Sequence, residues 1–160
     1  MIKNSPCRRA PALVFLFLHA LLANAAGATE SKSVAEDGLL GLRIGQHPIR
    51  AMVAHTTSER MIGLMYRTRL EPDQGMLFVY PEPALHAMWM KNTALPLSVA
   101  FIDERGVVIN IEEMQPRTLD AHAATRPAKY SLEMSGGWFA ERLVKPGTLV
   151  TGLDSAPPGE

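Results

Sequence analysis

The chain has almost no cysteine, because Cys7 is the only one. A single cysteine cannot form an intramolecular disulfide, so packing has to hold the fold. Cys7 also precedes the first apolar run, whereas the cysteine of a lipid-attachment site follows such a run. If the N-terminal segment is removed, the remaining domain has no cysteine nucleophile and no thiolate metal ligand.

The chain also lacks an excess of charge of either sign, with 16 basic and 16 acidic side chains. No long basic stretch is present, so nucleic-acid binding and binding to anionic membranes have no electrostatic basis. The apolar run at residues 12–22 is about 11 residues long, whereas a transmembrane helix needs roughly 20. Beyond a cleaved leader, the sequence therefore indicates no association with a membrane.

The N-terminal segment has the pattern of a secretory signal peptide. Lys3, Arg8 and Arg9 precede the apolar run, and small residues that fit an A-x-A cleavage site follow it. We expect cleavage after Ala25 or Ala28, and a mature protein that is periplasmic or secreted. Loss of the three basic residues leaves 13 basic and 16 acidic side chains, a net charge of −3.

The remaining sequence predicts one domain between two flexible ends. Residues 29–38 are polar and aperiodic and are expected to form a flexible leader. Residues 154–160 contain Pro157-Pro158-Gly159 and are expected to form a disordered tail. Residues 39–153 are long enough to bury a core of their own, and no internal repeat divides them.

Short runs with β-like alternation dominate this domain. Asp103 to Gly106 between two such runs predicts a hairpin turn, with Gly106 able to take the left-handed conformation. The predicted strands comprise residues 40–44, 49–54, 76–80, 86–90, 97–102, 107–111, 130–134 and 149–153.

Two short helices complete the prediction. Thr56 and Glu59 have the spacing of a capping box, and Met61, Ile62, Leu64 and Met65 provide an apolar face for the helix that follows. A second helix is expected at residues 138–143. The pattern indicates a mainly β (α+β) fold, either a compact antiparallel β-sandwich or a partly open barrel with two short helices.

Several blocks of sequence, in the same order, resemble the prokaryotic family catalogued as domain of unknown function 192. The resemblance covers residues from about 49 to 152 and implies a compact, mainly β domain that is often exported, without supplying an activity. Ser98 departs from the pattern, because the family usually has an aspartate there. The matching blocks are Glu59-Arg60, Gly63-Leu64-Met65, Arg67, Gly75-Met76-Leu77-Phe78, Trp89-Met90-Lys91-Asn92-Thr93, Pro96-Leu97, Phe101-Ile102-Asp103, Tyr130-Ser131-Leu132-Glu133 and Gly137-Trp138.

Five residues in these blocks form the candidate ligand site: Arg67, Trp89, Lys91, Asn92 and Glu133. A tryptophan beside a lysine suits a planar or anionic ligand, and arginine suits a carboxylate or phosphate. We therefore expect a small polar or anionic ligand in a cleft. The structural alternative is a buried tryptophan, a lysine or arginine paired with Glu133, and an asparagine that satisfies loop backbone.

Other functions remain open. In a strand, His86, Met88 and Met90 would share one face, and imidazole with thioethers selects copper(I). Met61, Met65 or Met76 could add a further ligand. No other cofactor is suggested by the sequence. The domain, expected to be a monomer, could instead present its edge strands or its long loop at residues 115–127 to a protein partner. An enzyme that uses Lys91 with Glu133 is the least supported alternative, because no catalytic triad or metal-hydrolase spacing is present.

Overall fold

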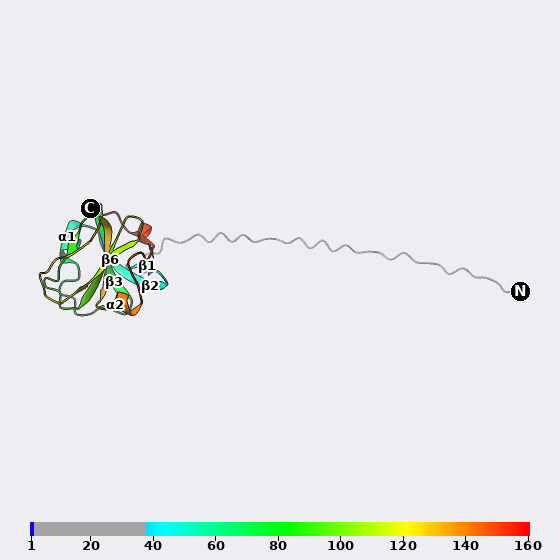
Figure 1. The fold of residues 1–160 in the computed structure, drawn as a ribbon, viewed down its shortest axis with the longest axis horizontal. Coiled ribbons are helices and arrows are strands. Elements are labelled where there is room, and N and C mark those ends of the chain that lie inside the picture. Colours follow the sequence, from blue (N-terminus) through cyan, green and yellow to red (C-terminus); the bar gives the residue numbers. More distant parts are fainter. Residues whose placement is uncertain (2–37) are drawn as a thin grey trace. The chain divides into compact units, whose positions relative to one another are not determined.

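The computed structural model describes Met1 and residues 38–160 (Figure 1). Apart from Met1 and Gly38, the predicted signal peptide and leader lie outside the described residues. Within the described residues, no helix has the length and apolar character that a membrane span requires.

The domain is built on a curled seven-stranded sheet that forms half a barrel. The strand order is β6-β5-β8-β3-β2-β1-β9, and a two-stranded sheet pairs β4 with β7. This confirms the mainly β prediction with a partly open barrel. The strands are β1 (Leu40–Ile44), β2 (His47–Ala54), β3 (Gln74–Ala84), β4 (Ala87–Met88), β5 (Leu97–Ile102), β6 (Val108–Met114), β7 (His122–Ala123), β8 (Ala128–Ser135) and β9 (Val150–Thr151).

One strand pair departs from the antiparallel pattern. β2 and β3 run parallel, with Ala51 opposite Gly75 and Ala54 opposite Phe78, whereas the other pairs in the large sheet are antiparallel. A parallel pair needs a crossover connection. The chain between β2 and β3 therefore leaves the sheet, and it contains the first helix.

That helix, α1 (Thr57–Ile62), begins at the predicted capping box. The Thr56 side chain accepts the Glu59 N–H at 3.3 Å, and the Glu59 carboxylate accepts the Thr56 N–H at 3.0 Å. The predicted apolar face is wrong in part, because Met61 and Ile62 are 70% and 58% exposed. The helix ends at Gly63, so the buried Leu64 packs from the turn after the helix.

The sheet is covered on both faces, so its central strands are mostly buried, polar residues such as Ser98 and Glu133 included. Every residue of β5 is buried. One core includes Leu77, Leu132 and the two aromatic side chains of α2 (Trp138–Glu141), whereas the other includes Phe78 and Phe101. The second core is closed by connections, not by a long helix, and α1 and α2 lie in different parts of the domain (Figure 1). The polar side chains of the candidate site lie on the connections that cover this second core.

Two predicted strands are shorter than expected. The strand expected at residues 86–90 contains only β4, because the Thr93 N–H bonds the Met90 carbonyl at 3.1 Å and Asn92 takes a φ of 56°. The paired strand therefore ends at Met88, although burial still alternates from His86 to Met90. The strand expected at residues 149–153 ends after Thr151, and a 3-10 turn, η1 (Leu153–Ser155), follows it. Gly106, by contrast, has the predicted left-handed φ, 80°.

The C-terminal residues pack on the domain instead of fraying from it. The Glu160 N–H bonds the His55 carbonyl at 2.8 Å, and Gly159 lies so close to the Tyr80 backbone that a side chain there would collide with it. The C-terminus lies beside α1 (Figure 1).

Candidate functional site

Three connections meet over the second core, namely those that follow α1, β4 and β6. The Tyr66 N–H bonds the Asn92 carbonyl at 3.0 Å, and the Arg117 N–H bonds the Thr93 carbonyl at 3.0 Å. These bonds join segments that are far apart in the sequence. They fix the side chains of the three connections relative to one another.

The same connections carry unusual backbone conformations. Tyr66, Asn92 and Arg117 have φ values of 64°, 56° and 61°, in the left-handed region. Such conformations are uncommon for residues other than glycine, cost about 1–3 kcal/mol each, and gather at functional sites. Three of them meet around one groove.

This groove, here called the cationic pocket, is open to solvent and has a volume of about 530 Å³. It contains three cationic side chains and no acidic one, and within residues 38–160 none of the three forms an ion pair. Its lining residues are Tyr66, Arg67, Thr68, Lys91, Asn92, Ala94, Arg117 and Leu119.

The structure brings together three of the five predicted site residues here. Arg67, Lys91 and Asn92 line the cationic pocket, and the Asn92 side-chain amide donates to the Tyr66 hydroxyl at 3.0 Å. Trp89 is half exposed, so its alternative assignment to the core is wrong. The Lys91 Nζ lies 5.3 Å from the centre of the Trp89 ring, a cation–π contact.

Glu133, the fifth predicted residue, lies in an apolar environment. Its neighbours across the sheet are Met76 and Val99, and it is only 4% exposed. The predicted pairing with Lys91 or Arg67 does not occur, and no hydrogen bond or ion pair to the Glu133 carboxyl is found among the described residues. Burial raises the pKa of this carboxyl to about 8, because a charge is poorly solvated there.

A small cavity of about 30 Å³ lies beside this carboxyl. We call it the Glu133 cavity; its volume is close to what one or two water molecules occupy. Most of its walls come from the blocks through which the chain resembles the family. Besides Glu133, its lining residues are Arg60, Met61, Ile62, Gly63, Leu64, Met65, Phe78, Met88, Trp89 and Thr93.

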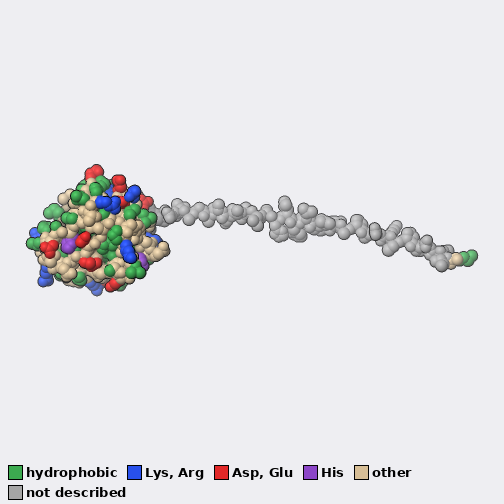
Figure 2. Space-filling model, viewed as in Figure 1, with side chains coloured by type: hydrophobic (Ala, Val, Ile, Leu, Met, Phe, Trp, Pro, Cys, Tyr) green, Lys and Arg blue, Asp and Glu red, His purple; other side chains and the backbone are tan. Residues whose placement is uncertain are grey.

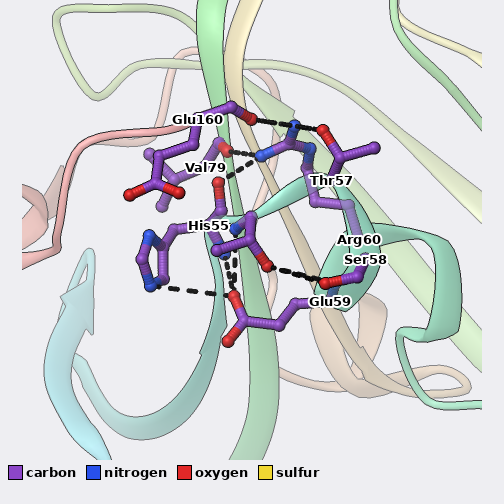
Figure 3. A network of polar contacts seen from close by, with 8 residues as sticks. His55, Thr57, Ser58, Glu59, Arg60, Val79 and Glu160 are labelled. Carbon is purple, nitrogen blue, oxygen red and sulfur yellow. Dashed lines mark hydrogen bonds and ion pairs between the residues drawn. The ribbon is translucent and has the colours of Figure 1, made fainter.

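Arg60 is the cation in this lining, but its guanidinium is engaged elsewhere. It donates to the carbonyls of His55, Val79 and Glu160 and to the Thr57 hydroxyl (Figure 3). The distances to the Val79 carbonyl and the Thr57 hydroxyl are 3.0 and 3.2 Å. Arg60 therefore ties α1 to β3 and to the C-terminus, and it does not neutralise Glu133.

A polar network borders the cavity on the other side. The Tyr80 hydroxyl and the Ser131 hydroxyl lie 2.9 Å apart, and both point at the Met88 sulfur, at 3.4 and 3.7 Å. Burial raises the pKa of Tyr80 to about 12, and the charge of Glu133 adds to this effect. The network holds the Met88 thioether in place.

The three residues of the predicted copper site do not gather at one cavity. The His86 ring stacks on the Tyr80 ring at 3.5 Å, with its Nε2 3.1 Å from the Glu82 carbonyl, and Met90 is fully buried. Of the three, only Met88 lines the Glu133 cavity. Across residues 38–160, no group of three histidine, cysteine or acidic side chains is arranged to hold a metal.

The departure at Ser98 is compensated by a neighbouring strand. The Ser98 hydroxyl lies 2.7 and 2.8 Å from the two carboxylate oxygens of Glu113 in β6. The Gly137 N–H is shared between the Ser98 hydroxyl, at 2.8 Å, and Glu113, at 3.1 Å. A carboxylate is therefore present at this position, although β5 does not supply it.

Sequence reasoning missed Tyr66, Arg117, Leu119 and Thr93. Arg117 and Leu119 lie in the long loop at residues 115–127, whose length was the one signal of a functional segment. The partners of this loop are set by tertiary hydrogen bonds, so its sequence did not indicate which side chains meet Lys91.

Comparison with protein-family models matches residues 41–152 to DUF192, described as "Uncharacterized ACR, COG1430". The chain belongs to this family. A solved structure, described as a transcription regulator by proposal and coming from Sinorhizobium meliloti 1021, is 32% identical to this chain with a TM-score of 0.69, and the match covers 74% of this chain and 95% of that one. A protein of unknown function from Novosphingobium aromaticivorans DSM 12444 is 32% identical with a TM-score of 0.68, covering 70% and 84%.

A comparison with curated proteins finds no match. Membership of DUF192 confirms the predicted family and makes the chain an uncharacterised domain.

Proposed function

We propose that this exported DUF192 domain binds a small anion, a carboxylate or a phosphate, in the cationic pocket. The observation that carries the proposal is the meeting of Arg67, Lys91 and Arg117 in one groove without an acidic neighbour or an ion pair among the described residues.

Charge supports this assignment. The domain after the predicted signal peptide has a net charge of −3, and Figure 2 shows side chains of both signs on the viewed surface. A pocket with three cationic side chains and no acidic one stands out on a domain whose net charge is negative. The three like charges repel one another, and this repulsion falls when an anion binds between them. Arg67 and Arg117 come from different connections, so their guanidinium groups can approach one carboxylate or phosphate from two sides.

The amide and the aromatic ring add selectivity. The Asn92 side chain donates to the Tyr66 hydroxyl, which fixes two polar groups at the rim. Tyr66 and Leu119 are 76% and 67% exposed, so the groove also offers apolar surface to the rest of a ligand. Residues of this type orient a ligand, whereas the cations provide most of the attraction.

Binding can be tested by NMR titration of the purified protein with inorganic phosphate and with acetate, in a low-chloride buffer. We expect shifts of amide signals in the connections that carry Arg67, Lys91 and Arg117. In the Arg67→Gln/Arg117→Gln variant we expect affinity to fall roughly tenfold or more, since hydrogen bonds to charged groups are lost.

The matched control is Arg69→Gln. Arg69 is exposed, lies close in sequence and pairs with Glu71 at 3.1 Å, outside the pocket lining. This variant should bind as the unmodified protein does. Equal loss in the control, or unchanged binding in the double variant, would refute the cationic pocket as the binding site.

Export is tested separately, by measuring the mass of the mature protein recovered from the periplasm. We expect a chain that begins at residue 26 or residue 29, as the two A-x-A sites predict. An uncleaved chain in the cytoplasm would contradict the export part of the proposal and leave the binding part intact.

A further inference from the structure

Three thioether side chains line the Glu133 cavity together with the buried carboxyl. Met61, Met65 and Met88 line the same cavity as Glu133, and Trp89 closes one side of it. Methionine is a common filler of cores, but Met61 is 70% exposed and Met65 and Met88 are only partly buried. The carboxyl they face has no partner in residues 38–160.

We propose that the Glu133 cavity binds one soft monovalent cation, copper(I), between the Glu133 carboxylate and the sulfur atoms of Met65 and Met88. Met61 lies at the mouth, and the Trp89 ring lies beside the ion. This site adjoins the cationic pocket, since the Met65 sulfur lies 4.0 Å from the Asn92 side-chain nitrogen, but it has its own lining and does not depend on the function proposed for that pocket.

The orientation of the donor atoms supports the proposal. Ser131 and Glu133 are two apart in β8, so their side chains are on the same face of the sheet. The Ser131 hydroxyl lies 3.7 Å from the Met88 sulfur, which places this sulfur over the face that carries the carboxyl. The Tyr80 hydroxyl contacts the same sulfur, so Met88 is positioned before any ion arrives.

The donor set selects the ion. Thioether sulfur favours copper(I), whereas magnesium and calcium require several oxygen ligands. Zinc sites are built from cysteine, histidine and carboxylate ligands, and no such group of three is present in the described part of the chain. One carboxylate balances one positive charge, so copper(I) forms a neutral complex there, and the proton of Glu133 passes to solvent.

Size and surroundings agree with a dehydrated ion. A cavity of about 30 Å³ holds one or two water molecules, so an ion there takes most of its ligands from the walls. The Trp89 ring, which already has the Lys91 Nζ 5.3 Å from its centre, lines the cavity beside the methionines. The guanidinium of Arg60, which lines the same cavity, is bound to carbonyl groups elsewhere (Figure 3).

This ligand set differs from the one predicted from the sequence. Of the three main ligands predicted from the sequence, only Met88 is kept, because His86 stacks on Tyr80 and Met90 is fully buried, whereas Met65 was expected only as an additional ligand. The two sets therefore predict different effects of substitution, and variants can separate them.

The test uses silver(I), which resists oxidation and has the ligand preferences of copper(I). Full-length protein with Cys7→Ser removes the competing thiol, and native mass spectrometry counts the bound ions. We expect one silver ion per chain. Met65→Leu/Met88→Leu and Glu133→Gln should each weaken binding roughly tenfold or more, the range typical for altered metal sites.

Two variants serve as controls. His86→Ala and Met90→Leu should bind silver as tightly as the parent protein does. If His86→Ala abolishes binding instead, the site is the one predicted from the sequence. Absence of stoichiometric silver, or unchanged binding in Met65→Leu/Met88→Leu, overturns the proposal.

Fluorescence gives a readout that does not depend on the folding of the methionine variants. The chain has two tryptophans, Trp89 and Trp138, and Trp138 lies in the first core. Silver bound beside Trp89 should quench the emission of the parent protein, and Trp89→Phe should abolish that quenching. Quenching that persists in Trp89→Phe would place the ion elsewhere.

Discussion

Asp103 and Glu133 are two buried carboxyls with opposite surroundings. Asp103 is 8% exposed and lies in the turn between β5 and β6, where it accepts the N–H groups of Arg105 and Val107 at 3.0 and 2.9 Å. The guanidinium of Arg105 lies 3.3 Å away. Glu133 is 4% exposed, and within the described chain it has no such partner.

The pKa values follow these surroundings. Burial opposes ionisation of Asp103, but the hydrogen bonds from Val107 and Arg105 outweigh it, so its pKa is lowered. Burial acts alone on Glu133, whose pKa is raised to about 8. The first acid stabilises a hairpin, and the second destabilises the sheet that holds it. A buried acid without a partner therefore points to a ligand, whereas a satisfied one points to the fold.

The largest expected effect is a loss of stability as the pH rises. Between about pH 4.5 and pH 8, folded Glu133 keeps a proton that the unfolded chain releases, so the free energy of unfolding should fall with rising pH, in total by about 4 kcal/mol. Urea denaturation of the metal-free protein at pH 5, 6, 7 and 8 measures this fall.

Glu133→Gln is the control for this change of stability with pH, since the glutamine amide does not titrate. The variant should lose most of the pH dependence in this range. An equal slope in the parent protein and the variant would show that other groups cause it, and the contrast with Asp103 would no longer hold.

A smaller effect is expected when the acid is replaced by an apolar side chain. At pH 8, Glu133→Met should raise the free energy of unfolding by about 1–4 kcal/mol, because buried charged groups often destabilise relative to apolar ones of similar size. Chemical denaturation measures the change. A lower stability in Glu133→Met would mean that the carboxyl has a structural partner after all.

The smallest effect concerns Asp103, which should behave in the opposite way. Asp103→Asn should lower the free energy of unfolding by about 1–2 kcal/mol at neutral pH, because bonds to a charged acceptor are lost. Its lowered pKa means that the ionised form stabilises the fold at neutral pH, and this advantage is lost as the pH falls into the acid range. The stabilities of the parent protein and of Asp103→Asn should therefore converge at acid pH, which thermal unfolding at several pH values measures.

Local signals in the sequence were enough to predict much of the fold. The capping box at Thr56 and Glu59 and the left-handed Gly106 depend on neighbouring residues, and both predictions are confirmed. The end of β4 was not predictable, because it depends on a turn at Asn92 and on a hydrogen bond from the Met90 N–H to the Thr118 carbonyl, 28 residues later. The exposure of Trp89, by contrast, follows the alternation of burial from His86 to Met90.

The candidate site was predictable only by residue type. Arg67, Lys91 and Asn92 do meet, as their chemistry suggested. The sequence did not indicate that Glu133 would lack a partner. Both expected partners, Arg67 and Lys91, line the cationic pocket and do not line the Glu133 cavity. Which cations remain unpaired is decided by tertiary structure.

The parallel pairing of β2 and β3 has a consequence for where binding is encoded in the chain. The crossover between them contributes Met61 and Met65 to one cavity and Tyr66 and Arg67 to the other. On the two proposals made above, substitutions in this crossover would change both binding sites at once, whereas the residues that pair β2 with β3 lie outside it. The stretch of this chain that would set binding is therefore distinct from the stretches that set the register of the sheet.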